Sequence, residues 1–423
     1  MQDPLEYLYG LKSTDIRLGL GPFTRVIERL GNPHTAYPTV LIGGTNGKGS
    51  IAAMVSSILI HAGLRVGLYT SPHLIDFRER VRINGELIAP SAVYQLMEEI
   101  RQKMGEEITY FEFLTAVAFL HFFRQKVDIA VLEVGMGGRL DATNVVRPVV
   151  SVVSNVSLDH QEYLGNRLDA ITREKGGIIK KNGVCITTAK QKRVTEILEG
   201  ICQRKKAILY RIGREIKVTH HNNGTFTYKG VRNSYPRLTC ALRGRHQIEN
   251  AAVAVGVIEL LAESGIETDE RSICEGLRKV EWEGRMEVLQ REPVILVDGA
   301  HNPAGASALS RTLREDFSYE RLILIFGVLS DKDYRSMLKR LAPLADRLLI
   351  TRPDTSRGMP AGNVASAAKR YRNEVEIVEN GRDALKRALA IAQKNDLICV
   401  TGSLYLVGEI KKMLNPLVCA GER

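Results

Sequence analysis

A glycine-rich run at residues 43–50, with the sequence GGTNGKGS, has the composition of a phosphate-binding turn. Residues 39–42 before it predict a strand, and residues 50–61 after it predict a helix. Backbone N–H groups of such a turn can surround a polyphosphate while Lys48 neutralises its charge. The run departs from the general P-loop pattern, because an isoleucine replaces the first glycine and a glycine follows the lysine. A glycine-rich turn alone is often only a bend, but strand, lysine and helix together predict a nucleotide site.

Three polar residues follow predicted strands and could ligate a metal ion. The hydroxyl residue is displaced from its usual place beside Lys48, so the Mg²⁺ that accompanies a triphosphate needs other ligands. Ser71 follows one strand, Glu133 closes a second and His160 follows a third. Each alone would more often be a turn residue or a satisfied polar group, but the carboxyl ends of parallel strands share one edge of a sheet. Their common placement predicts a magnesium site.

A second glycine-rich run, EVGMGGR at residues 133–139, does not form a dinucleotide-binding fingerprint. Leu140 stands where the third glycine of that fingerprint is required. Residues 139–144 instead predict a polar loop beside the metal that suits substrate contacts.

The segment DGAHNP at residues 298–303 leaves a predicted strand and enters a predicted helix. Asn302 and Pro303 account for the start of that helix as its cap and its first residue. Capping requires neither Asp298 nor His301, so these two side chains are candidates for chemistry.

The elements that position these residues predict a fold of the α/β class with two domains. Residues 1–292 would form a P-loop ATPase domain with a mostly parallel sheet, and residues 293–423 a smaller Rossmann-like α/β domain. The first is expected to have strands at residues 66–69, 128–134 and 149–153, helices at 91–103 and 111–123, and a peripheral antiparallel hairpin within 209–232. In the second, strands are expected at residues 294–297, 322–326, 347–350, 375–378 and 397–400.

The composition of the 423 residues is that of a globular protein, with 44% hydrophobic and 25% charged residues. No apolar stretch reaches the length of a membrane span and the first residues lack a signal-peptide pattern, so a cytoplasmic location is expected. The six cysteines include no Cys-x-x-Cys pair, which argues against a thiolate metal cluster and a disulfide framework. A formal charge of +11 favours anionic partners, and phosphorylated or polycarboxylate small molecules fit because no nucleic-acid module is recognisable.

Six segments together resemble the folylpolyglutamate synthase and dihydrofolate synthase family of the Mur ligase superfamily. They are GTNGKGS at residues 44–50, TSPH at 70–73, LEVGMGGRLDATN at 132–144, LDH at 158–160, REK at 173–175 and DGAHNP at 298–303. The resemblance spans nearly the whole chain in one order. The lysine-glycine-serine order favours the folate branch, because the Mur ligases of cell-wall synthesis usually have Thr or Ser directly after the lysine.

The resemblance implies binding positions for ATP, metal and a pterin ring. The ATP-binding residues would be Thr45, Asn46, Gly47, Lys48, Gly49, Ser50, Asn250, Arg285 and Asp298. Ser71, Glu133 and His160 would ligate Mg²⁺, with two ions expected, and Lys175 would be carboxylated by CO₂. The pterin pocket would be lined by Arg17, Leu18, Gly19, Leu20, Thr109, Tyr110, Phe111, Glu112, Leu140, Asp141 and Ala142. Arg17 stands where enzymes that make dihydrofolate have an acidic residue, so glutamate addition is favoured over the use of dihydropteroate.

The reaction implied by the resemblance is ATP-dependent addition of L-glutamate to folates through an acyl phosphate, with dihydropteroate as a second candidate acceptor. Lys48, Lys175 and His301 would be catalytic, His301 by orienting glutamate or the reacting carboxylate. Small molecules are the expected partners of a monomer, without nucleic acid or membrane. Two alternatives stay open, a Mur-type ligase acting on a cell-wall precursor and a P-loop NTPase that switches or acts on nucleic acid. Dependence of phosphate release on L-glutamate separates the NTPase from the ligases.

Overall fold

The computed structural model describes residues 4–11, 19–159, 161–221 and 224–414, and the chain divides into two compact units. Unit 1 comprises Met1–Ala241 and Ile248–Val280, and unit 2 comprises Leu242–Gln247 and Glu281–Arg423. The boundary expected between residues 292 and 293 differs from this division, because β12 (Glu287–Arg291) pairs antiparallel with β13 (Val294–Asp298) in the second sheet. The β12 sequence lacks an apolar run and is only half-buried, so it gave no strand signal.

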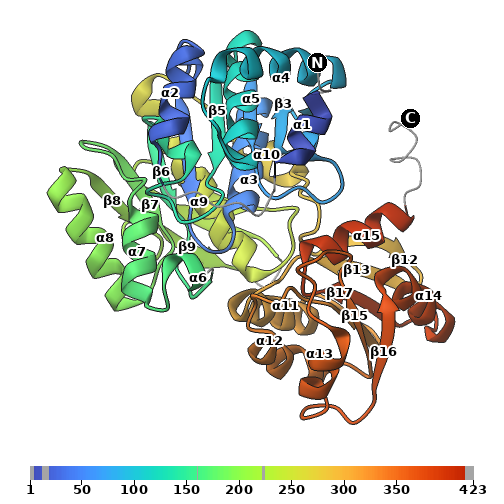
Figure 1. Cartoon of the computed structure of the whole chain (residues 1–423). Coiled ribbons are helices and arrows are strands. Elements are labelled where there is room, and N and C mark those ends of the chain that lie inside the picture. Colours follow the sequence, from blue (N-terminus) through green and yellow to red (C-terminus); the bar gives the residue numbers. More distant parts are fainter. Residues whose placement is uncertain (1–3, 12–18, 160, 222–223, 415–423) are drawn as a thin grey trace. The chain divides into compact units, whose positions relative to one another are not determined.

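The sheet of unit 1 has eight strands in the order β4-β3-β2-β5-β1-β6-β7-β8 (Figure 1). Its strands are β1 (Thr39–Gly43), β2 (Val66–Tyr69), β3 (Val81–Ile83), β4 (Glu86–Leu87), β5 (Ile129–Glu133), β6 (Val150–Val153), β7 (Val184–Thr187) and β8 (Ile208–Arg211). Neighbours from β2 to β8 are parallel, and β3 and β4 add an antiparallel edge. Both central strands, β1 and β5, are fully buried. The predicted mostly parallel sheet is confirmed.

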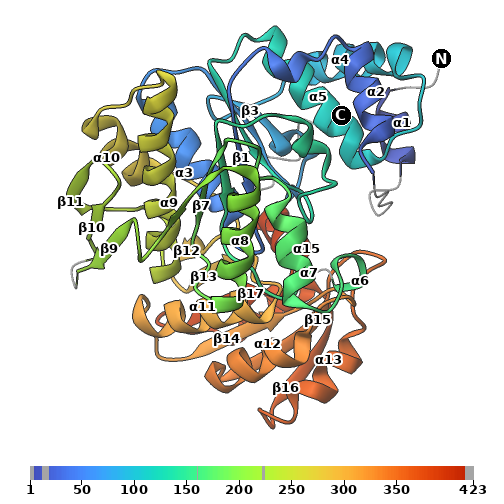
Figure 2. The ribbon, with the colours of Figure 1, turned by 90° about the vertical axis from the view of Figure 1, so that its left-hand side faces the viewer.

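Helices cover both faces of this sheet (Figures 1 and 2). They are α1 (Pro4–Gly10), α2 (Gly21–Arg29), α3 (Lys48–His61), α4 (Pro90–Met104), α5 (Tyr110–Arg124), α6 (Gln161–Leu164), α7 (Leu168–Gly176), α8 (Lys192–Lys205), α9 (Arg245–Leu261) and α10 (Glu270–Lys279), with short 3₁₀ turns η1 (Pro33–Thr35), η2 (Phe77–Arg80), η3 (Ala142–Val145) and η4 (Ala262–Ser264). Helix α3 packs on β1, β2 and β5, and α5 also packs on β2. Gly67 of β2 allows this close approach, because a Cβ there would lie 2.8 Å from the ring of Phe122.

A separate three-stranded antiparallel sheet consists of β9 (Lys217–His220), β10 (Phe226–Lys229) and β11 (Ser234–Leu238). The predicted hairpin is confirmed for β9 and β10, whereas β8 belongs to the large parallel sheet. Glu259 of α9 anchors this small sheet, because its buried carboxylate accepts hydrogen bonds from the Tyr228 hydroxyl at 2.6 Å and from the Asn233 N–H at 2.7 Å.

Unit 2 contains a six-stranded sheet in the order β12-β13-β17-β14-β15-β16, parallel except for β12. The remaining strands are β14 (Leu322–Phe326), β15 (Arg347–Arg352), β16 (Val375–Asn380) and β17 (Leu397–Thr401). The helices are α11 (Pro303–Glu315), α12 (Tyr334–Leu341), α13 (Ala361–Ala368), α14 (Gly381–Ile391) and α15 (Leu404–Leu414), with a 3₁₀ turn η5 (Ala342–Leu344). All five strands predicted for this domain are present, and β14 and β17 are buried throughout.

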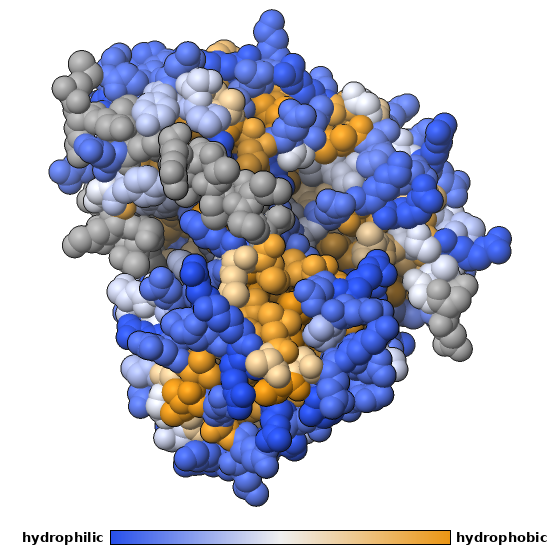
Figure 3. Space-filling model, turned by 90° about the vertical axis from the view of Figure 1, so that its right-hand side faces the viewer, coloured by the Kyte–Doolittle hydropathy of each residue, from blue (hydrophilic) through white to orange (hydrophobic). Residues whose placement is uncertain are grey.

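The exposed surface is mainly hydrophilic on the face shown in Figure 3, with apolar side chains gathered in a few areas. Large apolar residues with substantial exposure come from unrelated elements, such as Tyr9 of α1, Ile208 of β8 and Ile377 of β16. Across the described ranges, every helix is too short or too polar to cross a bilayer.

Candidate active site

The turn between β1 and α3 has the backbone geometry of a phosphate-binding loop. Gly44 and Gly47 have φ values of +128° and +83°, which L side chains rarely adopt. Helix α3 begins at Lys48, and the lysine Nζ donates to the Thr45 carbonyl at 3.2 Å. The N–H groups at the start of a helix carry partial positive charge, so the loop and Lys48 together suit an anionic phosphate chain. Ser50 lies buried in the first turn of α3.

A polar segment after β6 supports this loop, and sequence reasoning missed it. The Asn155 carbonyl accepts from Thr45 N at 2.8 Å, and the Asn155 side chain accepts from Asn46 N at 3.0 Å. Ser154 Oγ donates to the Asn46 carbonyl at 2.7 Å, and Ser157 N donates to Thr45 Oγ1 at 3.1 Å. These bonds hold Thr45 and Asn46 of the loop in place. The signal available in the sequence was a polar run directly after a buried strand.

Asn250 of α9, which the resemblance assigns to the nucleotide, lies against Gly47 of the loop. A Cβ added to Gly47 would lie 2.7 Å from Asn250 Oδ1, and the Asn250 side chain is 6% exposed. The backbone at Gly47 can therefore approach α9 only because this residue lacks a side chain.

Gly47→Ala should weaken nucleotide binding at least about tenfold, because the new methyl group collides with Asn250 and strains the loop. The matched control is Gly63→Ala, since Gly63 has a φ of +85° and no heavy atom within 4 Å of a built Cβ. Both variants share the strain of positive φ, but only Gly47→Ala should change the dissociation constant of ADP, measured by calorimetric titration. Equal affinities in the two variants would contradict this role of Gly47.

Ser71 and Glu133 lie together beside the loop. Glu133 ends β5 next to Ile42 of β1, and its side chain is 5% exposed. Glu133 Oε2 accepts a hydrogen bond from Ser71 N at 3.0 Å. His160, the third predicted metal ligand, lies outside the described residues. The described part of the chain holds no cluster of three His, Cys, Asp or Glu side chains suited to a metal, and the predicted set includes only one such described residue.

Lys175 of α7 is buried against the phosphate loop. Its Nζ donates to the Gly44 carbonyl at 2.8 Å, and the residue is 4% exposed. Burial, together with the nearby charge of Lys48, lowers the pKa of Lys175 to about 7. A buried lysine with a neutral fraction near pH 7 is a nucleophilic amine, unlike a solvated helix lysine.

The described residues of the predicted pterin pocket come from three segments of unit 1. Thr109 and Glu112 form a capping box at the start of α5, so their polar groups bond to each other. Asp141 caps η3 and also accepts from Met136 N at 2.9 Å, and burial raises its pKa. The Phe111 ring packs over Gly135, where a Cβ would lie 2.6 Å from the ring. The same segments contain Tyr110, Leu140 and Ala142, and the segment before α2 contains Gly19 and Leu20. Two further predicted residues, Arg17 and Leu18, lie outside the described residues.

The predicted residues of unit 2 gather at the carboxyl end of β13. The Asp298 carboxylate accepts from Met286 N at 3.0 Å and from Ala300 N at 2.9 Å. Arg285 lies beside Gly299, where a Cβ would overlap its guanidinium group. His301 Nδ1 lies 2.8 Å from the Gly299 carbonyl, and a carbonyl only accepts, so Nδ1 carries the proton. Asn302 caps α11 through the Gly305 N–H, as predicted.

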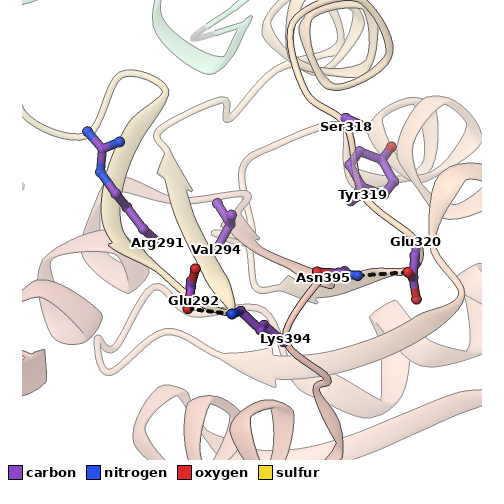
Figure 4. Close-up of a pocket in the computed structure, with 8 residues that line it drawn as sticks. All are labelled: Arg291, Glu292, Val294, Ser318, Tyr319, Glu320, Lys394 and Asn395. Carbon is purple, nitrogen blue, oxygen red and sulfur yellow. Dashed lines mark hydrogen bonds and ion pairs between the residues drawn. The ribbon is translucent and has the colours of Figure 1, made fainter.

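A pocket of about 380 Å³ in unit 2 lies at the opposite, amino-terminal edge of that sheet (Figure 4). Three of its charged groups pair with polar neighbours, Lys394 with Glu292 at 3.3 Å and Glu320 with Asn395 at 2.8 Å. Ligands of open parallel sheets bind at the carboxyl ends of the strands, so this pocket is not the candidate site.

Comparison with known proteins first defines the class. The family model for the Mur ligase middle domain matches residues 42–258, and that for the Mur ligase glutamate ligase domain matches residues 284–404. Together with the phosphate loop and the two α/β units, these matches place the chain in the Mur ligase superfamily.

Individual relatives then narrow the class. The dihydrofolate synthase/folylpolyglutamate synthase of Bacillus subtilis is 32% identical over 98% of this chain and 99% of its own length. The structure of Escherichia coli FolC in complex with DHPP and ADP has a TM-score of 0.90 at 31% identity, covering 98% of this chain and 97% of that one. The structure of Mycobacterium tuberculosis folylpolyglutamate synthase complexed with ADP has a TM-score of 0.89 at 32% identity, covering 97% of this chain and 98% of that one. The chain belongs to the folylpolyglutamate synthase and dihydrofolate synthase family.

Proposed function

We propose that this chain is an ATP-dependent ligase that adds L-glutamate to folates, with release of ADP and phosphate. The observation that carries the proposal is the convergence of Lys48, Lys175 and Glu133 around one phosphate loop. Family membership supports it, because the relatives over the full length are named folylpolyglutamate and dihydrofolate synthases. A Mur-type ligase acting on a cell-wall precursor is disfavoured by the same relatives.

The chemistry overcomes a poor leaving group, since a carboxylate cannot expel oxide. An oxygen of the folate carboxylate attacks the γ-phosphorus of ATP, the bond to the bridging oxygen breaks, and ADP leaves. The amino group of L-glutamate then attacks the carbonyl carbon of the acyl phosphate and expels phosphate, and the amine loses a proton. The protein must bring two anions within reacting distance, which is a task of positioning and charge neutralisation. Lys48 and the N–H groups of the loop supply positive charge for the triphosphate.

The residues beside the loop fit a divalent cation. Glu133 supplies a buried carboxylate, and the Ser157 hydroxyl is buried without a hydrogen-bond partner next to Thr45. In the proposal Ser71, Glu133 and His160 hold Mg²⁺, which supplies charge neutralisation for the phosphate oxygens. Support comes from a related structure of a bifunctional folylpolyglutamate synthase/dihydrofolate synthase, described with Mn, AMPPNP and L-glutamate bound. The number of ions, two by prediction, is part of the proposal.

A carboxylated Lys175 belongs to the same proposal. The side chain enters the loop region, and a carbamate there would convert an amine, which cannot ligate a metal while protonated, into an anionic oxygen donor. Arg285 and Asp298 are assigned to nucleotide contacts and His301 to orientation of glutamate or of the reacting carboxylate, on the strength of the family resemblance.

Purified protein tests the proposal in an assay of ADP release. With a reduced folate acceptor, ADP release should require L-glutamate and yield a folate lengthened by one glutamyl unit, detected by mass spectrometry. ADP release that proceeds equally well without L-glutamate would contradict the proposal and favour a P-loop NTPase. The same assay with dihydropteroate decides whether that acceptor is also used.

The remaining expectations stay predictions. Light scattering of the purified protein should give the mass of one chain, 47.0 kDa. A cytoplasmic location, and the lack of nucleic-acid partners, would be checked by fractionation and by retention on a DNA column.

A further inference from the structure

Arg80 is a buried arginine at the end of η2, directly before β3. It is 8% exposed. Its Nε donates to His73 Nδ1 at 2.9 Å, and its guanidinium carbon lies 5.5 Å from the centre of the Tyr110 ring. Within the described part of the chain, the side chain forms no ion pair with a carboxylate.

A buried guanidinium without a carboxylate partner is energetically unfavourable. Arginine stays protonated in proteins, so it cannot escape the cost of desolvation by losing its proton. Buried charges are therefore normally paired. An imidazole is neutral or positive and cannot compensate the charge, and a tyrosine ring offers only a weaker cation–π attraction. The described residues therefore leave this buried cation without a carboxylate in contact with it.

The Nη groups of this guanidinium are not completely enclosed by the described protein. The described side-chain nitrogen and oxygen atoms that are fully enclosed without a partner do not include those of Arg80. Because its Nη groups have no hydrogen-bond partner in the described chain and are not fully enclosed, they keep some contact with solvent. Two Nη groups side by side present the fork that binds a carboxylate in bidentate fashion.

The location of Arg80 connects two parts of the candidate site. His73 follows Ser71 by two residues, and Tyr110 begins α5 in the predicted pterin pocket. The charges of Arg80 and Asp141 both act on the pKa of the buried Tyr69 hydroxyl, Arg80 lowering it and Asp141 raising it. These three side chains therefore lie in one region of unit 1. Asp141 is not the missing counter-ion, because its carboxylate accepts hydrogen bonds from its own loop.

We propose that Arg80 binds a carboxylate of the acceptor substrate. This inference rests on the proposed function, and it adds a residue that recognises the acceptor to those that bind ATP and metal. Two carboxylates have the required chemistry. One is the group that becomes phosphorylated, which every acceptor carries, and the other is the α-carboxylate of the terminal glutamate, which folates have and dihydropteroate lacks.

Arg80→Met, which keeps the length of the side chain and removes its charge, tests the proposal. The KM for tetrahydrofolate should rise about tenfold to a hundredfold, while the KM for ATP stays within about twofold. Arg80→Lys, which keeps the charge without the fork, should have an intermediate KM. The matched control is Arg78→Met in the same turn, because Arg78 already pairs with Asp76 and is more exposed. That control should leave both KM values unchanged.

Comparison of acceptors distinguishes the two carboxylates. If Arg80→Met binds both tetrahydrofolate and dihydropteroate more weakly than the wild type does, Arg80 contacts the carboxylate that reacts. If only the binding of tetrahydrofolate is weaker, Arg80 contacts the terminal α-carboxylate. For an acceptor that the enzyme does not turn over, KM cannot be measured, so the increase in Tm that the acceptor causes serves as the measure of its binding. Unchanged acceptor binding, or an equal rise in the KM for ATP, would overturn the proposal.

Thermal stability separates recognition from a structural role. Arg80→Met should unfold at the same or a higher Tm than the wild type, because it removes a buried charge that lacks a counter-ion. A large fall in Tm with an unchanged acceptor KM would mean that Arg80 is only structural. If Arg80→Met does not fold, Arg80→Lys tests the proposal instead. The acceptor should raise the Tm of Arg80→Lys less than it raises the Tm of the wild type. An equal rise in the two proteins would overturn the proposal. Wild-type protein without glutamate-dependent ADP release would instead refute the proposed function itself.

Discussion

Glu133→Gln should lower the rate of glutamate-dependent ADP release at least about a hundredfold. Glutamine has nearly the same size and keeps an oxygen that can accept the hydrogen bond from Ser71 N, which Glu133 Oε2 now accepts at 3.0 Å. The local fold should therefore persist while the negative charge is lost. In the proposed site that charge holds the divalent cation against the triphosphate, so turnover should fail although the protein remains folded.

Direct metal binding gives this prediction a second measurement. Calorimetric titration of the protein with Mn²⁺ in the presence of ADP should show weaker binding for Glu133→Gln than for the wild type. Glu86→Gln is the control, because Glu86 is an exposed residue of the edge strand β4 and its loss of charge changes the net charge of the protein equally. A Glu133→Gln protein that keeps near wild-type turnover would remove Glu133 from the metal site.

The phosphate loop could be predicted because its chemistry is local. A strand, glycines with positive φ, a lysine and a helix follow one another within residues 39–61, and the structure has them in that order. Glu133 was also predictable, since an apolar strand that ends in an acid places a carboxylate at the edge where the loop lies. Such features depend on neighbours in the sequence and on the rule that parallel strands end together.

Contacts between distant segments could not be predicted. The support of Thr45 by Asn155 and Ser157 depends on β6 lying next to β1, which the pairing register sets and the local sequence does not. The placement of Lys175 against Gly44 likewise depends on how α7 packs after β6. Without the family resemblance, Lys175 would have been assigned to a solvated helix surface. The missed β12 strand illustrates the same limit, because only its partner β13 defines it.

Lys175→Arg should abolish both activity and a carbamate signal, because arginine cannot form a carbamate. In the wild type the neutral amine would attack CO₂, form an N–C bond and release one proton, which leaves an anionic carbamate. The pKa of Lys175 is lowered to about 7, so the neutral fraction rises as pH rises through that value. Protein equilibrated with ¹³C-bicarbonate should therefore show a ¹³C carbamate resonance at pH 8, a weaker one at pH 6, and none in Lys175→Arg.

Lys180→Arg is the matched control for that experiment. Lys180 is a partly buried lysine nearby in sequence, burial lowers its pKa to about 8, and its Nζ donates to the Asn144 carbonyl at 2.7 Å, but it does not contact the phosphate loop carbonyl that Lys175 contacts. Its replacement should leave the resonance and the turnover in place. In Lys175→Ala, added formate or acetate should restore part of the activity, because a small carboxylate can occupy the space of the carbamate. A resonance that persists in Lys175→Arg would show that the carbamate forms on another amine, and wild-type turnover in that variant would show that the reaction does not need a carbamate at residue 175.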